Sequence, residues 1–134
     1  MTRFVIAPDV ALYLARSGAA IADEHLLVAP TLLRSQVLSL LYQSVRRGEV
    51  TQADADRQLD YLRGFRIRLL GDRVLQRAAW RLAEQLGWED TLDAEYVALA
   101  QLQADAFVTL DTSLAATVQE LVTIAEPRAL LALK

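Results

Sequence analysis

The chain has 134 residues, a formal net charge of −3 and no cysteine. This length fits one domain, which can bury a core without a disulfide or a structural metal, so we expect a single domain over residues 1–134. Without cysteine there is no thiolate metal site and no cysteine nucleophile, so oxygen atoms or the single histidine, His25, would have to hold any metal, and zinc is not expected.

Charged residues interrupt the apolar segments at short intervals, and no run approaches the roughly 20 apolar residues of a membrane span. The segment from Met1 to Ile6 enters a strand-like run directly, without the long apolar region of a secretory signal. We therefore expect no membrane partner and a cytoplasmic location. A negative net charge is not typical of a nucleic-acid-binding protein, so RNA binding would require a local basic patch.

Short apolar runs and segments of helical period alternate along the chain. Strands are expected at residues 3–7, 26–28, 66–70, 106–110 and 121–125. Helices are expected at residues 10–15, 31–47, 52–63, 73–86, 93–103 and 112–119. Most strand runs are continuously apolar, which is typical of strands covered on both faces in a parallel sheet. The alternation predicts an α/β fold.

Two aspartates follow predicted strands directly. Asp9 comes after the run from Phe4 to Pro8, and Asp111 comes after the run from Phe107 to Leu110. Ligands of open parallel sheets bind at the carboxyl ends of the strands, so both positions are candidate site positions. Aspartate is also a preferred N-cap, and the sequence leaves open that each residue only caps the next helix.

Asp93 lies on a helical stripe with Val97, Ala100 and Ala104, and this stripe should face the core. A carboxylate at the head of an apolar stripe requires a partner, which backbone donors or a metal ion would supply. A capping box formed by Asp90 and Asp93 is the alternative interpretation.

Gln36 lies between Leu32 and Leu40 on the inward face of the predicted helix 31–47. A long amide side chain is costly there unless it is hydrogen-bonded, so we expect a polar partner beneath it.

Asp9, Gln36, Asp93 and Asp111 are far apart in sequence, but each stands at a strand end or on an inward face near a helix start. Carboxylates that converge repel one another and have raised pKa values unless a cation neutralises them. An oxygen-only cluster of this kind is a plausible site for Mg²⁺ or Mn²⁺. Such a site suits phosphodiester hydrolysis.

Four motifs in the expected order, spanning nearly the whole chain, resemble those of the PIN-domain family. They are the segments from Val5 to Leu12, from Ala29 to Leu41, from Asp90 to Ala100, and from Phe107 to Ala115. The third resembles the family signature Asp-Ala-x-Tyr-x-x-Leu-Ala, and the fourth resembles its next strand with a Thr-x-Asp ending.

The resemblance implies a three-layer α/β/α sandwich with a central parallel sheet of about five strands. It also implies a Mg²⁺- or Mn²⁺-dependent endoribonuclease and, for a short single-domain member, a VapC-type toxin. Its partners would be an RNA substrate, a cognate antitoxin and a second copy in a homodimer. Asp9, Asp93 and Asp111 would hold the metal, with Gln36 as a neutral ligand or orienting residue.

Two positions depart from the family pattern. The second motif usually supplies a glutamate where this chain has Gln36, and a small hydroxyl residue usually stands where it has Ala11. These departures put metal affinity and rate in question more than the fold. A degenerate PIN domain that binds RNA or a protein partner without cleavage therefore remains an alternative, and so does a structural domain whose acids are only caps.

The predicted helix 73–86 carries Arg73, Arg77 and Arg81 at four-residue intervals, with Trp80 between them. This face is interpreted as a solvated surface, an RNA-binding stripe, or an interface with a second copy or an antitoxin. His25 is expected on the surface, in a polar turn.

Overall fold

The computed structural model describes residues 1–132. Along the chain it contains β1 (Thr2–Ile6), α1 (Pro8–Ser17), β2 (His25–Pro30), α2 (Leu33–Arg46), α3 (Gln52–Arg63), β3 (Arg68–Leu70), α4 (Arg73–Leu86), α5 (Leu92–Gln103), β4 (Ala106–Val108), α6 (Thr112–Val118), β5 (Ile124–Ala125) and a short 3₁₀ turn, η1 (Pro127–Leu130).

The five strands form one parallel sheet in the order β3-β2-β1-β4-β5. β1 is the central strand, and Val5 stands opposite Val28 of β2 and Phe107 of β4. From β1 the chain moves outward to β2 and β3, and then returns through α4 and α5 to β4 on the other side of β1. The strand order therefore reverses between β1 and β4, which makes the carboxyl edge of these two strands the expected ligand site.

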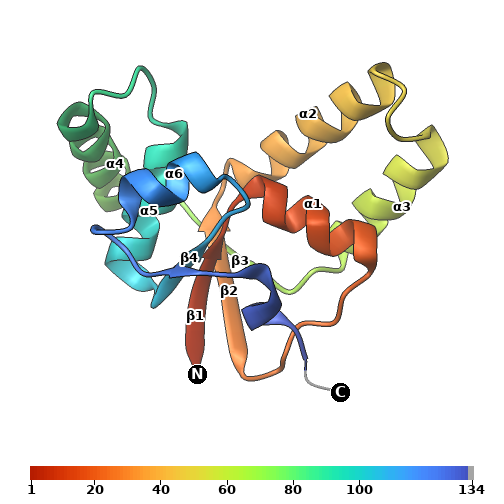
Figure 1. The fold of residues 1–134 in the computed structure, drawn as a ribbon, viewed down its shortest axis with the longest axis horizontal. Coiled ribbons are helices and arrows are strands. Elements are labelled where there is room, and N and C mark those ends of the chain that lie inside the picture. The colour runs from red at the N-terminus through yellow and green to blue at the C-terminus, as the bar shows by residue number, and fades with distance from the viewer. Residues whose placement is uncertain (133–134) are drawn as a thin grey trace.

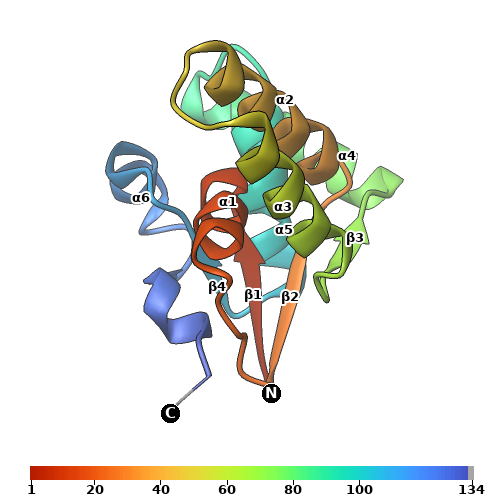
Figure 2. The ribbon, with the colours of Figure 1, turned by 90° about the vertical axis from the view of Figure 1, so that its right-hand side faces the viewer.

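Helices cover both faces of the sheet, as the continuously apolar strands predicted. α1, α2 and α3 lie on one side, and α4 and α5 lie on the other (Figure 1). Turned by 90°, the view shows α1 and α3 in front of the strands, with α5 behind them and α6 near the β4 edge (Figure 2). The predicted α/β class and three-layer sandwich are confirmed.

The core is centred on β1, β4 and α5. Val5, Ile6, Phe107 and Val108 are fully buried. In α5 every residue from Ala94 to Ala100 except Glu95 is buried, and apolar residues lie on almost every face of the helix. A helix that is apolar all round is an interior helix, and α5 packs between the sheet and α4.

Most element boundaries match the predicted ones within a few residues, and those of α3 and α4 match at both ends. α1 begins at Pro8 rather than Val10, because proline at the first helical position is already set for the helix. β5 is restricted to Ile124 and Ala125, since the amides of Leu121 and Val122 bond back to Val118 and close a turn.

Thr51 is the N-cap of α3, and its Oγ1 accepts a hydrogen bond from the Asp54 amide at 3.1 Å. The prediction for His25 is wrong. This residue is the first of β2, its ring packs edge-on against Phe4 at 5.0 Å, and its Nδ1 is buried without a hydrogen-bond partner. No helix in residues 1–132 is long and apolar enough to cross a membrane.

Candidate active site

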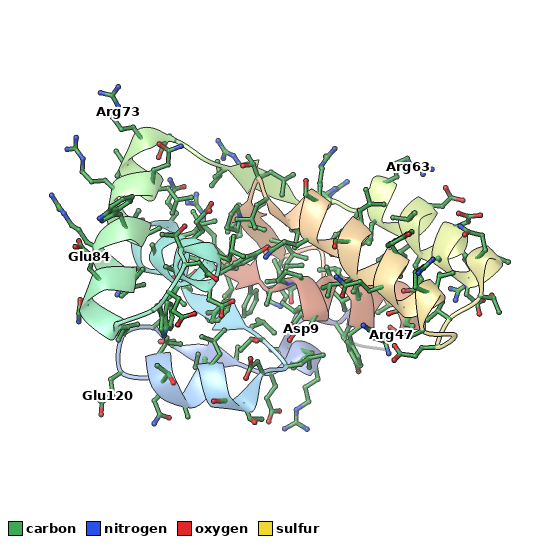
Figure 3. All side chains as sticks on the ribbon, turned by 90° about the horizontal axis from the view of Figure 1, so that it is seen from above. Asp9, Arg47, Arg63, Arg73, Glu84 and Glu120 are labelled. Atoms are coloured by element: carbon green, nitrogen blue, oxygen red, sulfur yellow. The ribbon has the colours of Figure 1, made fainter. Side chains whose placement is uncertain are left out.

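The predicted acidic residues gather at the carboxyl edge of the sheet, where the strand order reverses. Asp9 lies just beyond β1 and Asp111 just beyond the neighbouring β4, while Asp93 is in the first turn of α5. Viewed from above, Asp9 lies near the middle of the molecule, between the α2–α3 side and the α4–α6 side (Figure 3).

Asp9 is held by a neighbouring segment and does not cap its own helix. It is the second residue of α1, Ala7 is the N-cap, and the Leu110 amide donates to Asp9 Oδ2 at 3.3 Å. The interpretation of Asp9 as an N-cap is therefore wrong. Its Oδ1 is buried and has no hydrogen-bond partner. Burial raises the pKa of Asp9 above its ordinary value, backbone hydrogen bonds from Leu110 and Val10 oppose this, and the charge of Asp111 adds to it.

Asp111 caps the helix that follows it, which is one of the two roles that its position allowed. It is the N-cap of α6, and its Oδ1 accepts a hydrogen bond from the Leu114 amide at 3.0 Å. Its own amide donates to Thr109 Oγ1 at 3.1 Å. The capping interpretation is confirmed for Asp111, and these bonds fix the direction of a carboxylate that also acts on Asp9 and Asp93 through its charge.

Asp93 is not part of the alternative capping box. The N-cap of α5 is Thr91, which makes no side-chain cap, and Asp90 instead accepts a hydrogen bond from the Leu92 amide at 3.1 Å. The Asp93 residue is exposed, whereas Val97 and Ala100 of the same stripe are buried as predicted. The pKa of Asp93 is raised, mainly because its carboxyl group is partly buried. The charges of Asp111, Asp90 and Asp9 raise it further, in that order.

Asp9, Asp93 and Asp111 therefore influence one another through their charges. In residues 1–132, however, no three acidic or histidine side chains already stand at the spacing of metal ligands. A divalent cation would give the buried Oδ1 of Asp9 a partner and would reduce the repulsion among the three carboxylates. Carboxylate oxygens are ligands that suit Mg²⁺ or Mn²⁺. The residues present fit such an ion in chemistry, provided that the side chains shift to complete its coordination.

Gln36 has the polar partner that its position required, and this partner is Tyr96. The Tyr96 hydroxyl donates to Gln36 Oε1 at 2.5 Å. Tyr96 is 1% exposed and lies one helical turn after Asp93. Burial raises the pKa of Tyr96, and the charges of Glu95, Asp93 and Asp9 raise it further, so the hydroxyl remains a donor at neutral pH.

This hydrogen bond decides which end of the Gln36 amide is engaged. An amide has one oxygen acceptor and two N–H donors, and here a tyrosine hydroxyl occupies the oxygen. The oxygen keeps a second lone pair, and the N–H group is suited to donate to a carboxylate or to a phosphate oxygen. The role predicted for Gln36, as a neutral ligand or an orienting residue, stays a prediction.

Tyr96 is the residue that sequence reasoning missed. It was visible as the tyrosine of the third motif, at a helical spacing of three residues from Asp93. Its hydrogen bond to Gln36 could not be predicted, because the two residues are 60 positions apart and only the tertiary fold brings them together.

The helix α4 exposes Arg73, Arg77 and Arg81, which the sequence placed at four-residue intervals on one helix. Leu75 and Leu82 are buried beneath it, whereas Trp80 on the opposite face is 65% exposed. Within residues 1–132, no carboxylate lies within ion-pair distance of Arg73, Arg77 or Arg81. Arg73 and Glu84 lie toward opposite ends of this helix, at the outer margin of the molecule (Figure 3).

Comparison with known proteins supports the fold. No protein-family model matches the chain, and no curated protein matches it. Among solved structures, it is similar to PAE2754 from Pyrobaculum aerophilum, with 20% sequence identity, a TM-score of 0.69, and coverage of 96% of this chain and 92% of that one. The likeness extends over nearly the whole chain, and at 20% identity it establishes the shared α/β/α architecture alone.

Proposed function

We propose that this protein is a Mg²⁺- or Mn²⁺-dependent endoribonuclease of the PIN-domain type and the toxin of a toxin–antitoxin pair. The observation that carries the proposal is the convergence of Asp9, Asp93 and Asp111 at the strand-order reversal, with one buried carboxylate oxygen of Asp9 left without a partner. Motif order and the acidic positions support the family assignment, while the antitoxin partner and the cytoplasmic location rest on the resemblance alone.

The proposed roles follow from how each side chain is held. Asp9, Asp93 and Asp111 would hold the ion, which when bound supplies activation of water and charge stabilisation at the scissile phosphate. The Leu110 amide orients Asp9, and the Leu114 amide orients Asp111. Tyr96 orients Gln36, whose free N–H group is suited to donate to a phosphate oxygen. Fixed donors of this kind lower a barrier because they need no reorganisation during the reaction.

Calorimetric titration with Mn²⁺, combined with cleavage of a labelled single-stranded RNA, tests the proposal. We expect the parent to bind Mn²⁺ and to cleave, and Asp93→Asn to lose most of both. Asp23→Asn is the matched control, because Asp23 is an exposed aspartate at the opposite, amino end of the sheet. Equal Mn²⁺ binding by the parent and Asp93→Asn would reject the metal-site assignment.

A second candidate is a PIN-type domain that binds RNA or a protein partner without cleaving. It is favoured by the residue at position 36, where a neutral amide hydrogen-bonded to Tyr96 stands in place of the charged carboxylate of the family pattern. RNA binding that persists in Mn²⁺ without product formation would support this candidate. Cleavage that depends on Mn²⁺ and on Asp93 would support the first.

A further inference from the structure

A cavity of about 450 Å³ lies at the amino end of the sheet, at the opposite end from the candidate active site. Its volume is within the range of roughly 300–1,000 Å³ that is typical of small-molecule sites. One wall is the connection from the end of α1 down to the start of β2, and the other is the end of α3 with the residues that follow it (Figure 1). The first wall includes Asp23 and His25, and the second includes Tyr61, Gly64, Phe65 and Arg66.

Hydrogen bonds hold the two walls in place, so the cavity is formed before a ligand arrives. The Tyr61 hydroxyl on the second wall donates to the Ala19 carbonyl oxygen on the first at 2.7 Å. Burial raises the pKa of Tyr61, so this hydroxyl remains a donor at neutral pH. The Ala22 amide donates to the Leu130 carbonyl oxygen at 3.0 Å, which ties the first wall to η1. A preformed site loses little conformational entropy when it binds a ligand.

The second wall provides an aromatic surface. The ring centroids of Tyr61 and Phe65 are 5.5 Å apart, with 32° between the ring planes, and both residues are only partly buried. Gly64 stands between them in sequence and has no side chain. A Cβ added there would meet only backbone oxygens, at 3.9 and 4.0 Å, so the space beside it is open. Aromatic rings of this kind are surfaces on which nucleobases stack.

Two charged side chains of the cavity have no ion-pair partner within residues 1–132. They are Asp23 on the first wall and Arg66 on the second, and both are exposed. They are also beyond ion-pair distance of each other, which favours a ligand whose hydrogen-bond donor and anionic group are at opposite ends. Nδ1 of His25 is buried without a partner, and a buried polar atom in this state is uncommon in folded proteins.

We propose that this cavity binds a nucleoside monophosphate whose base carries an exocyclic amine, such as adenine or cytosine. The base would lie against Tyr61 and Phe65. Asp23 would accept a hydrogen bond from the amine, and Arg66 would pair with the phosphate. In a free amino acid the ammonium and carboxylate groups share one carbon, so they fit the two separate walls less well. The site does not depend on the proposed nuclease activity, because it lies at the other end of the sheet.

Titration calorimetry of the full chain with adenosine and cytidine monophosphate, in the presence of a chelator, tests the inference. We expect dissociation constants below roughly 1 mM. Arg66→Gln should weaken the binding of both nucleotides about tenfold and leave the binding of the nucleosides nearly unchanged, because only the nucleotides carry a phosphate. Asp23→Ala should remove a preference for cytidine over uridine monophosphate, because uracil lacks the amine.

Gly64→Leu should abolish binding, because it puts a side chain into the cavity. The φ of Gly64 is −89°, so a side chain there causes no left-handed strain, and thermal denaturation should show that the variant folds. If it does not fold, Arg66→Gln at its exposed position still tests the site. Arg77→Gln is the matched control, because it makes the same charge change at an exposed residue of α4 and should bind both nucleotides like the parent.

A parent that binds neither nucleotide at concentrations up to roughly 1 mM would overturn the inference. Equal affinity of the parent and a folded Gly64→Leu variant would also overturn it, because the nucleotide would then bind elsewhere. Binding of free tryptophan but of neither nucleotide would assign the cavity to an amino acid and would overturn it as well.

Discussion

The Tyr96 hydroxyl and the Gln36 amide oxygen, 2.5 Å apart, join the central helix α5 to α2 beside three interacting carboxylates. A neutral pair at this point adds no negative charge to the cluster. The alternative, a glutamate as in related motifs, would add one. The balance between metal-free stability and metal affinity therefore depends on position 36.

We expect the two partners to differ in the cost of their removal. Tyr96→Phe leaves only the half-buried Gln36 amide unpaired, and water can reach it, so the free energy of unfolding should fall by about 1 kcal/mol. Gln36→Leu leaves the buried Tyr96 hydroxyl without an acceptor, which should cost about 1–3 kcal/mol. Urea denaturation of both variants and of the double variant measures the coupling, which disappears if the hydrogen bond contributes nothing.

A second prediction concerns the pH dependence of the metal-free protein. The pKa of Asp93 is raised above 3.8 in the fold, so the folded state binds this proton more tightly than the unfolded state does. The resulting stabilisation is present below pH 3.8 and is lost as the pH rises through the raised folded pKa. At neutral pH the ionised carboxylate therefore destabilises the fold, although the N-terminus of α5 partly offsets this effect.

Asp93→Asn removes that charge without changing the size of the side chain. In the presence of a chelator, its melting temperature at pH 7 should equal or exceed that of the parent, and the difference should shrink as the pH approaches 4. Scanning calorimetry across this range is the measurement. A variant that melts several degrees lower at pH 7 would show that the Asp93 carboxylate is a structural group.

Asp111 should show two separable roles. Asp111→Asn keeps an oxygen that accepts from the Leu114 amide, so it should fold with nearly parental stability while losing Mn²⁺ affinity. Asp111→Ala also loses the cap and should destabilise the protein by about 1 kcal/mol. Urea denaturation and Mn²⁺ titration of the same two variants separate these effects. Parental Mn²⁺ affinity in Asp111→Asn would leave Asp111 only its capping role.

The fold was predictable from sequence because each strand and helix carries its own local signal. The continuous apolar runs of β1 and β4 indicated strands covered on both faces, and strand–helix alternation then limited the topology to a parallel sheet. The role of Asp9 could not be decided from the sequence. Aspartate after a strand is typical of both a cap and a ligand, and only the packing of Leu110 against the start of α1 separates the two.

The spacing of Asp93, Val97 and Ala100 predicted one inward face for this helix. In the structure α5 is buried on nearly all sides, whereas Asp93 is exposed because it lies in the first turn of the helix. The Tyr96–Gln36 hydrogen bond could not be predicted from local sequence patterns. Its two residues are 60 positions apart, and no helical or strand periodicity relates them.

The last prediction restores the glutamate of the family pattern. In Gln36→Glu, the carboxylate can still accept from the Tyr96 hydroxyl, and a hydrogen bond to a charged acceptor is stronger than the present one. Against this gain, a fourth negative charge is added to a partly buried cluster in which Asp9 and Asp93 already have raised pKa values. Repulsion within the cluster acts on every pair, so we expect the metal-free melting temperature to fall.

The same charge should tighten the binding of a divalent cation that prefers carboxylate oxygen, because one carboxylate oxygen can bind the ion while the other accepts from Tyr96. The melting temperature of Gln36→Glu should therefore rise more on addition of Mn²⁺ than that of the parent, since at the same concentration a ligand that binds the folded state more tightly stabilises it more. Calorimetry with a chelator and with Mn²⁺ measures both signs. Gln43→Glu is the control, because it adds the same charge to an exposed position later in α2. If Gln36→Glu and Gln43→Glu respond equally to Mn²⁺, position 36 lies outside the metal site, and the Tyr96–Gln36 pair is a packing contact between α2 and α5.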